Sequence, residues 1–142
     1  MPGIVVGVDG SEHSQKVLDW AMNEAALRQA PLTVLTVHPV ARSSWTGNPI
    51  VFPEDAPEVE ASRKAAEAAV NTAAGKLGGA KPPSVTVRAV NGVPAQELIA
   101  ASADADLVVV SSRGGGGFPG LKMGSVSSQV ASHAECPVVV IR

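Results

Sequence analysis

The sequence is poor in aromatic and sulfur-bearing side chains. It has no tyrosine, two tryptophans, two phenylalanines and one cysteine, Cys136. A single cysteine excludes a disulfide within the chain and fits a reducing compartment. Because aromatic residues are scarce, valine, alanine, leucine and isoleucine have to fill the core.

The sequence also lacks long apolar runs and a strong excess of either charge. No apolar stretch approaches the roughly 20 residues that a membrane-spanning helix needs, and no charged segment of a signal peptide precedes the first apolar run. The formal net charge of -2 argues against broad electrostatic binding to nucleic acid. We therefore expect a soluble cytoplasmic protein without a membrane or nucleic-acid partner, folded as one domain over residues 1–142.

Short β-branched apolar runs alternate with segments of helical periodicity. The runs cover residues 4–8, 32–37, 85–90, 107–110 and 138–141. Continuous apolar strands that alternate with helices are typical of a parallel sheet covered on both faces. With right-handed crossovers, the pattern predicts a doubly wound α/β fold, with five parallel strands in the order 3-2-1-4-5 and helices on both faces.

Several residues predict where the helices begin and end. Ser11 is expected to cap the first helix, and Asp55 with Glu58 resembles a capping box at the start of the second. Gly78-Gly79 is expected to end that second helix. Between them, residues 39–55 form a connection whose length is usually associated with function or mobility.

The most informative segment is the glycine-rich stretch from Ser111 to Ser125, which follows the fourth apolar run. Glycine has no Cβ, so a phosphate can approach its backbone N–H group closely. The helix expected from Val126 adds unpaired N–H groups and partial positive charge. In the predicted strand order the first and fourth strands are neighbours, so Asp9 and Ser111 flank a cleft at their carboxyl ends. These features predict a nucleotide-phosphate site.

Other sequence motifs for catalysis or metal binding find little support. Lys122 follows Leu121 rather than glycine, which excludes a Walker P-loop. The formal G-x-G-x-x-G at residues 115–120 lacks the later strand that a dinucleotide site needs. No G-x-S-x-G is present, and the histidines and Cys136 lack zinc-ligand spacing.

At this point the sequence resembles the universal stress protein family over nearly its full length. The segments that carry the resemblance are residues 4–11, 32–38, 92–94, 105–110, 124–127 and 136–142, together with Gly114. The ATP-binding branch is marked by glycine, two residues, glycine, nine residues and Gly-Ser/Thr. Gly114 and Gly124-Ser125 keep the nine-residue gap, but Ser111 occupies the position of the first glycine. A serine is strained there if a positive φ is needed, and suitable if only a small side chain is needed; the intact remainder of the motif favours the second interpretation.

The resemblance implies an α/β fold of the adenine nucleotide hydrolase-like type, an ATP cleft and a homodimer joined through the last strand. Carried over by position, Asp9 would approach the ribose or a Mg²⁺ ion, and the backbone of Val37 would meet the adenine edge. The implied phosphate side of the site consists of Ser111, Arg113, Gly114, Gly124, Ser125, Val126 and Ser127. The implied dimer interface consists of Val138, Val139, Val140 and Ile141.

The leading hypothesis is an ATP-binding universal stress protein that acts as a nucleotide-responsive dimeric module in the stress response. A binding module is favoured over a fast enzyme because no general base or activated nucleophile is evident. Two alternatives stay open: a slow Mg-dependent ATPase using Asp9, and an interaction protein of the same family that binds no nucleotide, to which Ser111 points. Plainer roles also stay open: Asp9 as a turn residue, the glycine run as a connection, and Ser125 as a helix cap.

Overall fold

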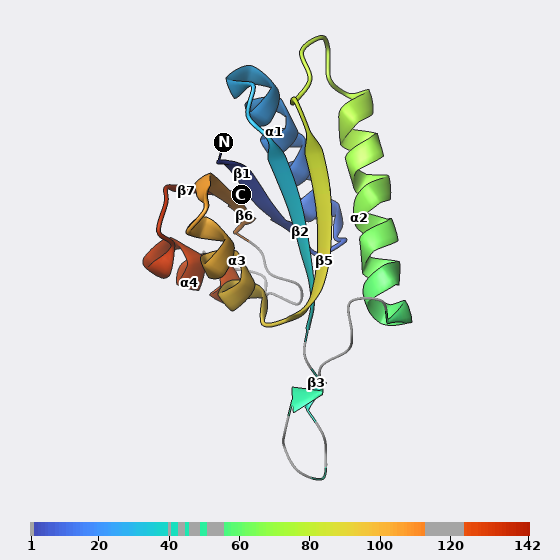
Figure 1. Ribbon diagram of the computed structural model, residues 1–142, viewed down its shortest axis with the longest axis vertical. Helices are drawn as coiled ribbons and strands as arrows, with labels where there is room; N and C mark the ends of the chain where they lie inside the picture. The colour runs from blue at the N-terminus through green and yellow to red at the C-terminus, as the bar shows by residue number, and fades with distance from the viewer. Residues whose placement is uncertain (1, 40, 43–44, 46–48, 51–55, 113–123) are drawn as a thin grey trace.

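The computed structural model describes residues 2–39, 41–42, 45, 49–50, 56–112 and 124–142 (Figure 1). Five parallel strands form one sheet in the order β5-β2-β1-β6-β7. They are β1 (Gly3–Val8), β2 (Leu32–Pro39), β5 (Val85–Gly92), β6 (Ala105–Ser111) and β7 (Val138–Ile141). Counted along the five predicted strands, this is the order 3-2-1-4-5, so the predicted sheet is confirmed.

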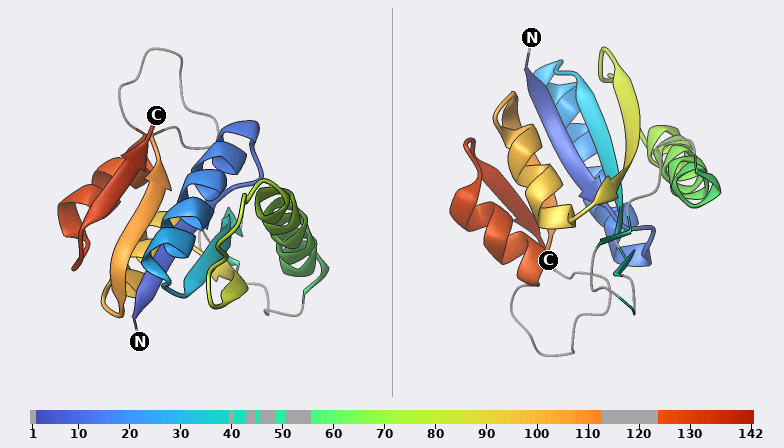
Figure 2. Two further views of the ribbon diagram at one scale, coloured as in Figure 1. Left: turned by 90° about the horizontal axis from the view of Figure 1, so that it is seen from above. Right: turned by 60° about the horizontal axis from the view of Figure 1, so that its bottom comes forward.

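Four helices cover the two faces of the sheet. Helices α1 (Glu12–Arg28) and α2 (Pro57–Gly75) lie on one face, and α3 (Pro94–Ser102) and α4 (Ser125–His133) lie on the other (Figures 1 and 2). Because side chains alternate along a strand, Ile4 and Val6 pack under α1 while Val5 packs toward α3 and α4. None of the helices in these described ranges is both long and apolar enough to cross a membrane.

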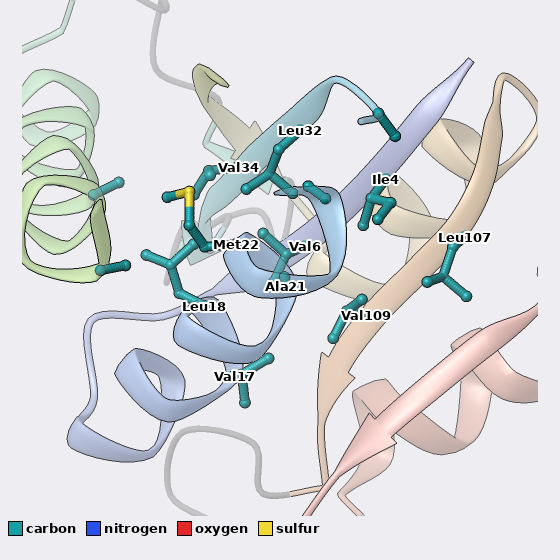
Figure 3. Packing of buried hydrophobic residues seen from close by; sticks show 14 residues of the cluster. Ile4, Val6, Val17, Leu18, Ala21, Met22, Leu32, Val34, Leu107 and Val109 are labelled. Atoms are coloured by element: carbon teal, nitrogen blue, oxygen red, sulfur yellow. The ribbon is translucent and has the colours of Figure 1, made fainter. Parts of the chain in front are cut away.

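The core is aliphatic, as expected from the composition. Figure 3 shows its larger part, a cluster that joins Leu18 and Met22 of α1 to side chains of β1, β2 and β6. A second cluster on the opposite face joins Val108 of β6 to helices α3 and α4. No aromatic side chain is buried among the described residues, so branched aliphatic side chains supply the packing.

Both ends of α1 are capped by hydrogen bonds. The Ser11 side-chain oxygen accepts a hydrogen bond from the backbone N–H of Ser14 at 3.1 Å, which confirms the predicted cap. At the other end Gln29 adopts a left-handed conformation with φ of 51°. Its backbone N–H reaches back to the last helical carbonyls, so the chain turns before Pro31 is reached.

The predicted capping box at the start of α2 is wrong. Ala56 is the N-cap of α2 and no side chain caps this end, whereas Asp55 itself lies outside the described residues. Pro57 at the first helical position explains the start, because its missing N–H needs no partner there. The helix also ends at Gly75, before the predicted Gly78-Gly79.

Two further boundaries differ from those read in the sequence. β2 continues through His38 and Pro39, which pair with Asn91 and Gly92 of β5. The connection after it contains a small antiparallel pair, β3 (Ala41–Arg42) with β4 (Pro49–Ile50). A strand of only two residues is too short to show an apolar pattern that could be recognised in the sequence.

Two leucines of α1 differ in burial, so we expect alanine substitutions at them to differ in their effect on the free energy of unfolding. Leu18 is fully buried, whereas 79% of the Leu27 side chain surface is exposed. We expect Leu18→Ala to lower the free energy of unfolding by about 2–5 kcal/mol because it removes packed methyl groups and leaves a cavity. Leu27→Ala should change it by less than about 0.5 kcal/mol. Urea unfolding followed by circular dichroism checks both, and similar losses in the two variants would contradict this account of the core.

Candidate functional site

A cleft of about 700 Å³ opens at the carboxyl edge of the sheet. The ends of β1, β2 and β6 form its floor, and the first residues of α3 and α4 form one wall. Five of the residues predicted from the sequence line it: Asp9, Val37, Ser111, Ser125 and Val126. These residues come from four separate segments, which the parallel sheet brings to one edge.

The turn after β1 places Asp9 at the cleft. One carboxylate oxygen of Asp9 accepts a hydrogen bond from the backbone N–H of Ser11 at 2.9 Å. Gly10 between them has a φ of 83°, a conformation that glycine adopts without a Cβ clash. Asp9 therefore has the turn role left open in the sequence, and its exposed carboxylate still has acceptor sites for a ligand.

The end of β2 leaves one side of its backbone open beside the cleft. β1 pairs with β2 only as far as Val8 opposite Thr36. β5 continues alongside Val37 and His38 on the other side. At the level of Val37, the β1-facing side of β2 therefore borders the cleft, where a planar base could meet backbone groups.

Ser111 ends β6 and lines the cleft without backbone strain. It pairs with Ile141 of β7. Among the described residues, Gln29 and Gly10 alone have a positive φ. The backbone at Ser111 therefore does not require glycine in this structure, and of the two interpretations of the serine, a position that needs only a small side chain fits the observed conformation.

The start of α4 presents uncapped backbone N–H groups to the cleft. Gly124 is the N-cap and no side chain caps it, so the alternative of Ser125 as the cap is wrong. The Gly124 N–H is itself used, donating to the Ser112 carbonyl at 2.6 Å. Ser125 and Val126 line the cleft, and unpaired N–H groups at a helix start favour an anion.

Ser127 does not line the cleft, unlike the predicted site residues Ser125 and Val126. Its side chain is fully buried and its hydroxyl donates to the Gly124 carbonyl at 3.0 Å. In this arrangement it fixes the first turn of α4 rather than facing the cleft. Two other predicted site residues, Arg113 and Gly114, lie outside the described residues.

Among the described residues that line the cleft, charged side chains are sparse. Within the described part of the chain, no three histidine, cysteine or acidic side chains gather as they would around a metal ion. Cys136 does not line the cleft. Burial raises the pKa of its thiol, and the negative charge of Asp106 raises it further, so Cys136 is less reactive than an exposed thiol.

Several residues that line the cleft were missed in the sequence. They are Gly7, Thr36, His38, Ser62, Pro94 and Leu98. Their shared signal is position, since most lie at the carboxyl end of a strand or the first turns of a helix, where doubly wound sheets bind ligands. A Cβ on Gly7 would lie 3.0 Å from Leu98 Cδ1, which shows how closely α3 approaches β1.

The fold and this cleft define a class: a doubly wound α/β protein with a ligand cleft at the reversal point of its sheet. The model of the universal stress protein family matches residues 2–142. The chain belongs to that family. It is 36% identical over 141 residues to the universal stress protein Rv2005c of Mycobacterium tuberculosis, covering 98% of this chain and 47% of that relative.

A universal stress protein of Mycolicibacterium smegmatis is 35% identical over 139 residues, again covering 98% of this chain and 47% of the relative. The chain thus spans about half the length of the curated relatives it matches.

Solved structures of the family share the fold. The universal stress protein UspA from Lactobacillus plantarum superposes with a TM-score of 0.76 at 26% identity, covering 99% of this chain and 97% of that chain. A universal stress protein in complex with cAMP gives a TM-score of 0.68 at 28% identity, covering 99% and 96%. One from Archaeoglobus fulgidus in complex with dAMP gives 0.61 at 26% identity, covering 100% and 98%.

We expect replacement of glycine by alanine to have opposite effects on stability at two positions: Gly10, in the turn after β1, and Gly75, at the end of α2. A Cβ would have free space at both Gly10 and Gly75, but only Gly10 has a left-handed φ. We expect Gly10→Ala to lower the free energy of unfolding by about 1–2 kcal/mol because the alanine backbone is strained there. Gly75→Ala at the end of α2 should raise it by about 0.4–1 kcal/mol. Thermal unfolding checks the pair, and a loss at Gly75 as large as that at Gly10 would contradict the assignment of strain.

Proposed function

We propose that this chain is an ATP-binding universal stress protein that acts as a nucleotide-responsive, dimeric module in the cytoplasmic stress response. The observation that carries the proposal is the meeting of Asp9 with the uncapped start of α4 across one cleft. This pairs a carboxylate, suited to sugar hydroxyls, with N–H groups suited to phosphate. Relatives solved with cAMP and dAMP support an adenine nucleotide as the ligand class.

The lining supports one orientation of the nucleotide. We place the adenine at the end of β2, where the backbone side at Val37 is open. The ribose then lies at Asp9, and the phosphates run toward Ser111 and the first turn of α4. The cleft volume of about 700 Å³ falls within the roughly 300–1,000 Å³ of small-molecule sites.

The binding energy required is modest. A hydrogen bond to a charged group contributes roughly 1.5–3 kcal/mol, and micromolar affinity corresponds to about 8 kcal/mol in total. Several backbone contacts to phosphate with burial of the base on Leu98 and Val126 reach that range after association costs. Mg²⁺, if bound, would take Asp9 and the nucleotide's phosphates as ligands, because magnesium sites commonly combine one carboxylate with phosphate oxygens.

Calorimetry tests nucleotide binding by comparing the affinities of several nucleotides for the natural chain and for two aspartate variants. We expect ATP to bind with a micromolar Kd, and Asp9→Ala to weaken binding about 10- to 100-fold because it removes a charged hydrogen-bond acceptor. Asp104→Ala is the matched control, since Asp104 is exposed and does not line the cleft. Parallel titrations with AMP and cAMP, and with EDTA in place of Mg²⁺, measure the contribution of the added phosphates and the metal.

Two results would reject the proposal. One is the absence of heat and of thermal stabilisation at millimolar ATP, AMP and cAMP. The other is nucleotide binding that occurs only after Ser111→Gly, which would assign the natural chain to the branch that binds no nucleotide.

The dimer is proposed through the outer edge of β7. Within the described part of the chain this strand pairs with β6 alone. All four of its residues are apolar and half-buried: Val138, Val139, Val140 and Ile141. An uncovered apolar edge invites pairing with another strand. The same strand in a second copy offers a self-complementary partner, as a two-fold interface requires.

Light scattering tests this dimer. At about 50 µM, well above a micromolar Kd, we expect twice the chain mass of 14.4 kDa. Val140→Lys should give monomer because it places a charge on the pairing edge. Val85→Lys is the control, since it makes the same change at a half-buried valine of the opposite edge strand, β5. A natural chain that is monomeric, or a dimer lost only in Val85→Lys, would reject the β7 interface.

A further inference from the structure

A second hollow of about 330 Å³ lies between α1, α2 and the sheet. We call it the α1–α2 hollow; Gln15, Ala69 and Thr72 line it and do not line the cleft. Asp9 and Thr36 line both spaces, so the two open into one another at the carboxyl end of β1. Figure 2 shows α1 and α2 lying side by side on this face of the sheet.

Small side chains keep this space open. The wall contributed by α2 consists of Ser62, Ala65, Ala66, Ala68, Ala69 and Thr72. Two contacts hold the helices at a fixed separation: the Gln15 amide donates to the Ala69 carbonyl at 3.1 Å, and Lys76 Nζ lies 2.7 Å from Asp19 Oδ2. These two contacts between α1 and α2 oppose collapse of the hollow.

Thr36 is the group that points to a ligand. Its residue surface is 93% removed from solvent, given a relative exposure of 7%. Alternation along β2 directs its side chain to the face of Leu32 and Val34, which pack under α1 and α2. No residue in the described ranges forms a hydrogen bond with its hydroxyl. Buried hydroxyls normally have a partner. In those same ranges no sealed polar atom lacks one, so this hydroxyl reaches open space, which is the hollow where it adjoins the cleft.

The charges of the lining select the chemistry of a ligand. Among the described residues that line the α1–α2 hollow, Asp9 alone is charged and none is a lysine or arginine. An anion would find no counter-charge, whereas the carboxylate accepts hydrogen bonds from hydroxyls. The alanine methyl groups offer contact to a carbon skeleton. Hydroxyl, carboxylate and methyl surfaces together match a small uncharged polyol.

We propose that the α1–α2 hollow is a second binding site, for a small uncharged polyol of the size of a single sugar ring. Thr36 pairs with one ligand hydroxyl, Asp9 accepts from another, and Ala66 and Ala69 contact the carbon frame. The volume of about 330 Å³ lies at the lower end of the range for small-molecule sites, roughly 300–1,000 Å³. The site does not depend on nucleotide binding, although both ligands would meet at Asp9.

The experiment is an NMR titration of the full chain with myo-inositol and with glycerol, in the absence of nucleotide. We expect saturable shifts at the backbone amides of Gln15, Ala69 and Thr72, with a millimolar Kd for myo-inositol. Thr36→Val should weaken binding at least about tenfold because it removes the hydroxyl and keeps the shape. Thr36→Ser should retain binding, and Ala69→Leu should abolish it by filling the hollow.

Thr33→Val is the matched control. It makes the same change on the same strand, but alternation places Thr33 on the opposite face, and it does not line the hollow. It should bind as the natural chain does. Thr36→Val should melt at the same or a higher temperature, because the hydroxyl it removes has no protein partner.

Three results would overturn the proposal. The first is no saturable shift at about 100 mM polyol, a concentration far above a Kd of 1 mM. The others are equal affinity in the natural chain and Thr36→Val, and a lower melting temperature for Thr36→Val than for Thr33→Val. Nucleotide titrations run on the same samples report on the cleft separately, so failure of one site is distinguished from failure of the other.

Discussion

The pairing of β1 between β2 and β6 is the constraint on which the other features depend. Val6 lies opposite Val34 on one side and Val109 on the other, and all three side chains are fully buried. A parallel strand buried on both faces can be connected only by helical crossovers, so the chain must leave its carboxyl end in a turn and begin a helix. The short turn from Asp9 to Ser11 is the result. The cleft and the α1–α2 hollow meet at this turn.

The same constraint gathers helix starts at one edge of the sheet. α1, α3 and α4 each begin after a strand that ends at that edge, so their unpaired N–H groups face one space. They differ in how those groups are satisfied. Ser11 caps α1 with its side chain, whereas α3 and α4 have no side-chain cap. In the sequence α4 alone also follows the glycine-rich stretch, which is why we propose the phosphate contacts at its start.

The chain shares its sheet-and-helix frame with other members of the universal stress protein family. The frame consists of short valine-rich strands and alanine-rich helices, and relatives with about a quarter of their residues identical keep it. The edge is where this chain departs from the ATP-binding pattern, at Ser111. In the structure that serine lies in regular strand conformation, without a positive φ.

The sequence alone determined the five strands of the main sheet, apart from the end of β2, together with their order and the edge at which the cleft lies. Continuous β-branched runs that alternate with helical segments indicate a parallel sheet, so the pattern of residues is enough to place Asp9, Ser111 and Ser125 at one edge of it. The start of α2 at Ala56, the cap of α4 at Gly124 and the burial of Ser127 were decided by tertiary packing, because several nearby residues had similar local propensity. Thr36 and the α1–α2 hollow lay wholly beyond the sequence. A threonine in a strand has the same local signature whether its hydroxyl is bonded or free, and only the separation of two helices, fixed by contacts between residues more than fifty positions apart, leaves a space for it to face.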